Sequence, residues 1–187
     1  KKDVSYTVIH WQENADDDGY SYKESETKTG AADSQTTAKA KSYDGFTAQS
    51  ITNVTIAGDG STIVNVYYKR NVYDVKFYSY SYRDWNGSHS ATEYTSLRIT
   101  AKYGANISDK WPTYNGSSTW STSDSENKGP YQVNLQTMPL NGDEFYGPKT
   151  ESGSETAYYY VEVLPGETSD KTYNHVDYKL HHKDTSP

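Results

Sequence analysis

Residues 62–70 read TIVNVYYKR, and the alternation in this stretch decides the class of fold. Apolar or aromatic residues stand at even positions from Val64 to Tyr68, and Asn65, Tyr67 and Lys69 stand between and after them. Successive side chains of an extended segment point to opposite faces, so this pattern predicts a β-strand that is buried on one face only.

The same period of two recurs along most of the chain. Asn-Gly and Asp-Gly pairs separate several of these stretches, and such pairs favour the positive φ angles of tight turns. Only Asp33–Tyr43 has helical character, with Asp33 or Ser34 as the N-cap. The expected fold is therefore mostly β, of the α+β class with one short helix. The other predicted strands are Ser5–Trp11, Tyr20–Thr27, Tyr73–Tyr82, Ser96–Tyr103, Tyr131–Thr137, Ala157–Leu164 and Tyr173–His181.

Composition limits how such sheets can be stabilised. Only 33% of the 187 residues are hydrophobic, but 20 are tyrosine and 4 are tryptophan. Each buried Tyr or Trp removes roughly 150–250 Å² from water, so small Tyr-rich cores are expected. The chain has no cysteine, which excludes disulfides, zinc–thiolate sites and cysteine nucleophiles.

The net charge of −7 is spread along the chain. No basic patch with interleaved aromatic residues is present, so we expect no nucleic-acid partner. No apolar run of about 18 residues and no signal peptide is present either, and we expect no membrane insertion. The sequence starts with KKDVSY and ends with KDTSP, from which we expect an internal piece of a longer protein.

Residues 1–71 combine two strands, a helix and two further strands, which is a β-grasp arrangement. Three stretches carry a family resemblance: YTVIHW (6–11), TGAADSQTTAKAKSYDGF (29–46) and GDGSTIVNVYYKRNVY (58–73). They resemble repeat modules of Gram-positive cell-surface proteins, in the mucin-binding-protein-like and internalin B-repeat-like β-grasp families.

Residues 72–187 resemble an enlarged relative of the same module. The matching stretches are VYDVKFY (72–78), ITAKYGANISDKWP (99–112) and TMPLNGDEFY (137–146). A Ser/Asn/Trp-rich insertion at Pro112–Lys128 and an extra strand pair near the end depart from the family pattern. We therefore expect two tandem modules, a β-grasp repeat at 1–71 and an elaborated B-repeat-like module at 72–187 that acts as the binding domain.

The resemblance implies an extracellular location on a bacterial surface, in a wall-anchored parent with neighbouring repeats. It implies no catalytic residues, and its implied ligands are a host protein such as immunoglobulin, or mucin glycan. The sequence itself shows none of the common catalytic motifs. Asn14–Gly19 imitates the start of a calcium loop but also fits a plain turn. We expect no enzyme, no cofactor and no metal.

Tyr78, Tyr80 and Tyr82 share a strand face with Asp74 and Lys76, so we expect their rings to face solvent. Tyrosine and tryptophan give large, rigid contact areas at recognition surfaces. We predict binding to a host protein in preference to mucin glycan, and a structural spacer is the alternative. The candidate ligand-binding residues are Tyr78, Tyr80, Tyr82, Trp85, Trp111, Tyr114, Trp120, Tyr158 and Tyr160.

Overall fold

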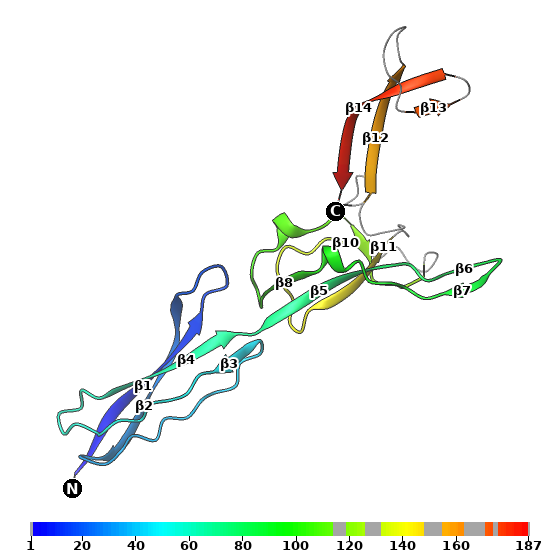
Figure 1. The fold of residues 1–187 in the computed structure, drawn as a ribbon. Coiled ribbons are helices and arrows are strands. Elements are labelled where there is room, and N and C mark those ends of the chain that lie inside the picture. Colours follow the sequence, from blue (N-terminus) through cyan, green and yellow to red (C-terminus); the bar gives the residue numbers. More distant parts are fainter. Residues whose placement is uncertain are drawn as a thin grey trace. The chain divides into compact units, whose positions relative to one another are not determined.

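The computed structural model describes residues 2–113, 119–125, 132–147, 155–162, 171–173 and 176–186, with side chains in 2–113, 119–125 and 133–147. The fold is mostly β (Figure 1). These residues contain no α-helix and only two single-turn 3-10 helices, Thr95–Leu97 (η1) and Ser108–Lys110 (η2). None of their helices is long and apolar enough to cross a membrane.

The chain forms two compact units. The first consists of Lys1–Val75, Ile99–Trp111 and Asn134–Asp143, and the second of Lys76–Arg98, Pro112–Val133 and Glu144–Pro187. The units alternate along the sequence, so the division into modules 1–71 and 72–187 stays a prediction about which segments fold independently.

A four-stranded mixed sheet dominates the first unit, with the order β2-β1-β4-β3. Its strands are β1 (Asp3–Glu13), β2 (Tyr20–Ala31), β3 (Phe46–Ala48) and β4 (Ile63–Arg70). β1 and β2 form an antiparallel hairpin, and β3 pairs antiparallel with β4. β1 and β4 run parallel at the centre, in register from Thr7↔Ile63 to Gln12↔Tyr68.

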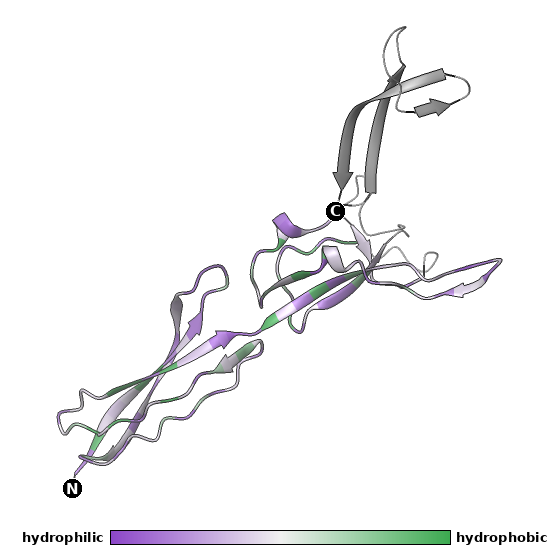
Figure 2. Cartoon of the chain, viewed as in Figure 1, coloured by the Kyte–Doolittle hydropathy of each residue, from purple (hydrophilic) through white to green (hydrophobic). Residues whose placement is uncertain are grey.

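One face of this sheet makes the core of the first unit, and hydrophobic residues recur along β4 between hydrophilic ones (Figure 2). Val64, Val66 and Tyr68 are buried, and their neighbours at odd positions are exposed, which confirms the one-sided strand predicted from TIVNVYYKR. The remaining buried members of this core are Tyr6, Val8, Ala38 and Ile56.

The helix predicted at Asp33–Tyr43 is wrong. Asp33 has a left-handed φ of 69°, and Gln35 pairs with Thr55 in an isolated bridge. Thr36 and Ala38 are buried while Thr37 is exposed, an alternation of two that belongs to an extended segment. No apolar residue stands three or four positions after Ala38, so a helix here would have no apolar stripe to bury.

Side chains replace the backbone hydrogen bonds that a helix would have supplied. Asn53 Oδ1 accepts from the Ala38 backbone N–H at 2.8 Å, and Tyr6 Oη accepts from the Thr37 N–H at 3.2 Å. Tyr68 Oη accepts from the Lys41 N–H at 2.8 Å. Residues 36–45 therefore lie over the inner face of the sheet as an extended covering segment.

Arg70, at the end of β4, connects the main sheet to the rest of the first unit. Its Nε donates to the Glu13 backbone oxygen at 2.7 Å, and its Nη1 donates to the Tyr103 oxygen at 2.9 Å. The guanidinium also lies 4.8 Å from the centre of the Phe46 ring. Lys102 adds an ion pair to the Glu13 carboxylate at 3.1 Å. Lys102 ends β8 (Ile99–Lys102), which pairs antiparallel with the first half of β5 (Val72–Ser79).

In the second unit, hydrogen-bonded strands follow the order β10-β9-β11-β5. The new strands are β9 (Trp120–Ser121), β10 (Gln132–Val133) and β11 (Asp143–Gly147). Phe77, Trp120 and Phe145 form its aromatic core, with ring centres of Phe77 and Trp120 4.9 Å apart. A hairpin of β6 (Tyr82–Asp84) and β7 (Gly87–His89) follows β5.

A separate sheet with the order β12-β14-β13 is described by its backbone. Its strands are β12 (Glu155–Glu162), β13 (Lys171–Tyr173) and β14 (Val176–Ser186), all antiparallel. Each strand predicted from the sequence overlaps an observed one.

The substitution Asn53→Ala tests the role of side chains in fixing the covering segment. Its amide oxygen accepts from both the Ala38 N–H and the Thr36 hydroxyl. Losing both bonds is expected to lower the free energy of unfolding by about 1–2 kcal/mol, measured by urea denaturation. The exposed neighbour Thr52 is a matched control, and Thr52→Ala is expected to change stability by less than about 0.5 kcal/mol. Equal effects of the two substitutions would contradict this account.

Candidate binding surface

The tyrosine series that begins with Tyr78 in β5 lies on the face opposite the buried residues of that strand, as its sequence predicts. Phe77 is fully buried and Ser79 is 6% exposed. Tyr78, Tyr80 and Tyr82 are half-buried, so the three rings are neither covered by other strands nor fully open to water. Part of each ring is therefore accessible to a partner.

Neighbouring side chains orient the first ring of the series. The Tyr78 and Tyr146 rings lie 5.4 Å apart with planes 30° from parallel. The Tyr78 hydroxyl donates to Glu144 Oε1 at 3.3 Å. Burial, followed by the charges of Glu144 and Glu93, raises the pKa of the Tyr78 phenol. The group is thus a neutral hydrogen-bonding phenol at physiological pH.

The third ring stands on the β6–β7 hairpin. Tyr82 and His89 are a cross-strand pair, and their rings stack 4.3 Å apart with planes 7° from parallel. His89 Nε2 lies 3.0 Å from Asp84 Oδ1, and the same carboxylate oxygen accepts from the Asn86 backbone N–H at 2.8 Å. These contacts fix a short hairpin from within.

Trp85 occupies the turn of this hairpin and is 92% exposed. An indole stabilises a core only when its apolar area is buried, so an indole exposed to water does not contribute to the core. The side chain of Trp85 is therefore accessible from solvent.

A shallow hollow of about 380 Å³ lies beside the hairpin. Hydroxyl groups, the stacked pair and one arginine line it, so it is polar and open. The lining residues are Ser81, Tyr82, Arg83, Ser88, His89, Ser90 and Ser125. We define the candidate binding surface as this hollow together with Tyr78, Tyr80, Tyr82 and Trp85.

Trp111 and Trp120 do not belong to this surface. They are 8% and 3% exposed, and the Trp120 Nε1 donates to the Pro112 backbone oxygen at 3.1 Å. The expectation that both indoles are accessible because they lie near Gly/Ser/Asn-rich loops is wrong. The second unit has few aliphatic residues, and its core uses Trp120 instead, against Phe77 and Tyr94.

The other candidates cannot be assigned to a face. Tyr114 lies outside the described residues. Tyr158 and Tyr160 belong to β12, for which the backbone alone is described.

The described residues contain no group of three or more His, Asp or Glu side chains that could hold a metal ion. In the acidic turn at 16–18, Asp17 Oδ1 accepts from the Asn14 side chain and the Gly19 N–H. Asp18 pairs with Lys102, and Asp16 accepts from the Asn106 N–H. Three neighbouring carboxylates thus serve three different protein contacts.

A second aromatic surface, which the sequence interpretation missed, lies on the outer face of the first sheet. Tyr22 and Tyr67 are 59% and 41% exposed, and both rings neighbour Trp11. The Trp11 Nε1 donates to Asn65 Oδ1 at 2.8 Å, and the Tyr20 ring packs 5.1 Å from Tyr67. The alternation around Tyr67 was visible in the sequence, but the parallel register that brings Trp11 beside it was not.

No family model and no curated protein sequence matches the chain.

Substitution of two tryptophans distinguishes core from surface. Trp120→Ala is expected to destabilise the second unit by about 3–5 kcal/mol because it leaves a cavity against Phe77. Trp85→Ala is expected to change stability by less than about 0.5 kcal/mol. Thermal unfolding followed by near-ultraviolet circular dichroism measures both. Similar losses for the two variants would contradict the assignment of Trp85 to the surface.

Proposed function

We propose that this chain is a non-catalytic binding module of a bacterial surface protein that engages a host extracellular protein, with an immunoglobulin favoured over mucin glycan. The observation that carries the proposal is the 92% exposure of Trp85 on a hairpin fixed by the Tyr82–His89 stack and the Asp84 contacts. Tryptophan and tyrosine are enriched among the few residues that contribute most of the binding energy at protein interfaces.

A protein partner fits the geometry better than a sugar. A sugar ring covers one face of an indole, whereas a projecting indole loses most of its exposed area only when a partner surface encloses it. Tyr78 and Tyr82 are already oriented by their neighbours, so little side-chain entropy is lost on binding. The adjoining hollow offers hydroxyls for polar contacts at the rim.

The β-grasp assignment of the first module is part of this proposal. The order β2-β1-β4-β3 with β1 parallel to β4 supports it, and the extended residues 36–45 take the position expected for the helix. With the sequence resemblance, this supports an extracellular, wall-anchored parent that carries further repeats.

No chemistry is included in the proposal. His89 and Asp84 resemble two members of a catalytic triad, but one His89 ring face is stacked on Tyr82. Among the described contacts, none of the serines that line the hollow hydrogen-bonds to the His89 ring. The pair therefore acts within the hairpin.

The test is binding of the whole chain to immobilised immunoglobulin, to other serum proteins and to mucin. Trp85→Ala, which removes a side chain with little role in stability, is expected to weaken the interaction with the retained partner at least about 30-fold. The triple substitution of Tyr78, Tyr80 and Tyr82 to Ser is expected to abolish it, with folding checked by circular dichroism.

Tyr22→Ser with Tyr67→Ser is the matched control, because it removes two exposed rings from the first unit instead. Wild-type affinity for every partner in the Trp85→Ala and triple variants would overturn the site. Loss of binding in the control alone would move the site to the first sheet.

A structural spacer is the second candidate function. It is favoured by the direct continuation of β4 into β5, with Asn71 alone between them, and by the Arg70 contacts that close the first unit. Retention of no partner from serum or mucin would support this function.

A further inference from the structure

His10 is an ionisable side chain enclosed in the core of the first unit. It lies on β1 between Val8 and the β1–β2 turn, on the inner face of the sheet, and it is 0% exposed. Histidine is the side chain whose ordinary pKa, about 6.5, lies closest to physiological pH, so the surroundings of this ring decide how the unit responds to acid.

The hydrogen bonds of the ring define its protonation. His10 Nδ1 lies 2.7 Å from the Tyr68 Oη, which already accepts from the Lys41 backbone N–H. The Tyr68 hydroxyl proton is thus free to donate to Nδ1, and the neutral ring then carries its hydrogen on Nε2. Nε2 has no hydrogen-bond partner among the described residues, and the nearest carboxylate oxygen, Glu26 Oε1, is 3.9 Å away.

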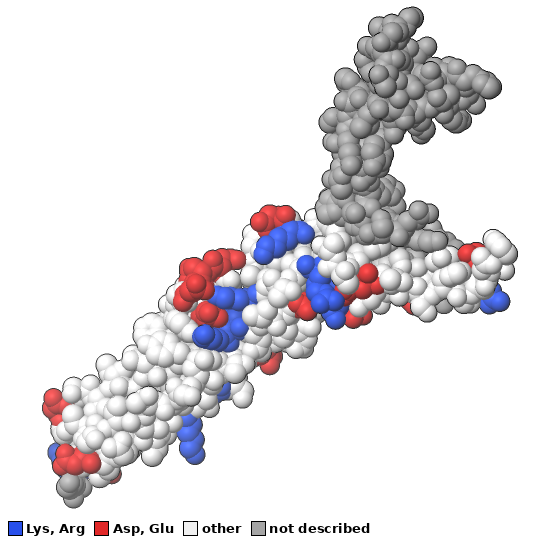
Figure 3. All heavy atoms as spheres, in the orientation of Figure 1, with Lys and Arg blue, Asp and Glu red and all other residues white. Residues whose placement is uncertain are grey.

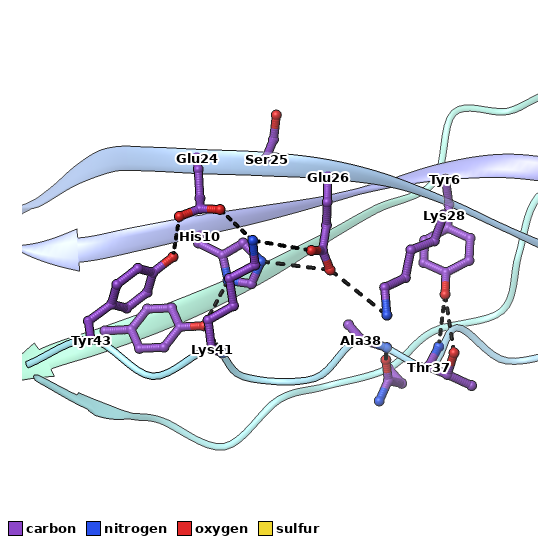
Figure 4. A network of polar contacts seen from close by, with 12 residues as sticks. Tyr6, His10, Glu24, Ser25, Glu26, Lys28, Thr37, Ala38, Lys41 and Tyr43 are labelled. Carbon is purple, nitrogen blue, oxygen red and sulfur yellow. Dashed lines mark hydrogen bonds and ion pairs between the residues drawn. The ribbon is translucent and has the colours of Figure 1, made fainter.

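Charged and titratable groups face the ring from every element packed against it (Figure 4). β2 supplies Glu24, Glu26 and Lys28, β4 supplies Tyr68, and the covering segment supplies Lys41 and Tyr43. Lys41 pairs with Glu24 and lies 3.5 Å from Glu26, which is 3.8 Å from Lys28. The Tyr43 hydroxyl donates to Glu24 at 2.9 Å. The covering segment is thus attached to the sheet through the groups around His10.

We propose that His10 makes the attachment of the covering segment, residues 36–45, sensitive to acid. A proton on Nδ1 removes the lone pair that accepts from Tyr68. The Tyr68 hydroxyl would then receive N–H groups from both His10 and Lys41, and its own proton would lose its acceptor. Protonation also creates a cation with no access to water, and the covering segment opens to hydrate it.

The direction of the pH dependence follows from the burial of the ring. Burial lowers the pKa of His10, the Glu26 carboxylate opposes this in part, and the Lys41 ammonium adds to it. The open form therefore binds the proton at higher pH than the closed form. Stability of the closed form is complete above the ordinary histidine pKa of about 6.5 and falls as the pH decreases towards the lower value of the closed form.

Glu24 and Lys41, two of the groups around His10, do not change charge between pH 8 and pH 5.5. Hydrogen bonds from Lys41 and Tyr43 lower the pKa of Glu24, and the bond to Glu24 raises the pKa of Lys41. Loss of the Lys41–Glu24 pair therefore does not explain an opening between pH 8 and pH 5.5.

Amide hydrogen exchange of the whole chain tests the proposal, with the Lys41 N–H as the reporter because it donates to Tyr68. After correction for intrinsic exchange, its opening constant is expected to rise below about pH 6.5 by up to about tenfold per pH unit, the limit for one proton. The backbone N–H of Val8, in the same sheet, reports global unfolding and is expected to stay protected.

His10→Gln is expected to remove this pH dependence, because the amide oxygen of the introduced glutamine accepts from Tyr68 but the amide does not titrate. His89→Gln, on the exposed hairpin of the second unit, is the matched control and is expected to retain it. Loss of the dependence in the control, or a Lys41 opening constant that is the same at pH 8 and pH 5.5 in the wild type, would overturn the proposal.

A direct titration of the wild-type His10 ring by nuclear magnetic resonance covers the case in which His10→Gln does not fold. A midpoint clearly below the ordinary value supports the proposal, and Glu26→Gln is expected to lower it further than Glu24→Gln does. A midpoint at or above the ordinary value contradicts the proposal, since acid would then strengthen the closed form.

Discussion

The parallel pairing of β1 with β4 is the constraint on which the first unit depends. These two strands are far apart in sequence, and their pairing aligns Val8 with Val64 and His10 with Val66 on one buried face. β2 and β3 add to the two sides of this pair, and residues 36–45 cover its inner face. Because only about one-third of the residues are hydrophobic, this sheet has a core on one side only, and its outer face is polar and aromatic.

Polar side chains supply much of the stabilisation that aliphatic packing supplies in proteins with more hydrophobic residues. Tyr6, Tyr68 and Asn53 each accept a hydrogen bond from the backbone of the covering segment. Such bonds contribute about 1 kcal/mol each when made, but an unpaired buried N–H costs more than that. The fold of this segment is therefore specific in its partners and sensitive to their chemistry, and His10 acts on it through its hydrogen bond with Tyr68.

The sequence predicted strands well because alternation is a local signal, and burial alternates from Ile63 to Lys69 in β4 and from Asp74 to Ser79 in β5. It failed at Asp33–Tyr43, where alanines and lysines favour a helix locally but the acceptors that stabilise the extended form come from residues 6, 53 and 68. Partners this distant in sequence leave no periodic signal.

For the candidate binding residues too, features with a local sequence signal were predicted, and features that depend on distant residues were not. Exposure of Trp85 followed from its position beside an Asn-Gly turn, and the strand period placed Tyr78, Tyr80 and Tyr82 on the face opposite Phe77, but it did not predict that these tyrosines are half-buried. Burial of Trp111 and Trp120 depended on what packs against them, such as Phe77 and Tyr94 around Trp120. The Trp11–Tyr67 pair likewise required knowledge of which strands are neighbours. On the face shown in Figure 3, acidic and basic side chains are interspersed. The distribution of charge therefore did not help to predict the candidate binding surface or the second aromatic surface.

The parallel arrangement of β1 and β4 also determines how the first sheet responds to tension. A force that enters at the start of β1 and leaves at the end of β4 pulls the two strands past each other along their length. The paired positions from Thr7↔Ile63 to Gln12↔Tyr68 are then loaded in shear, and their hydrogen bonds must break together rather than one after another. Such a geometry resists extension far better than a hairpin that is unzipped from one end.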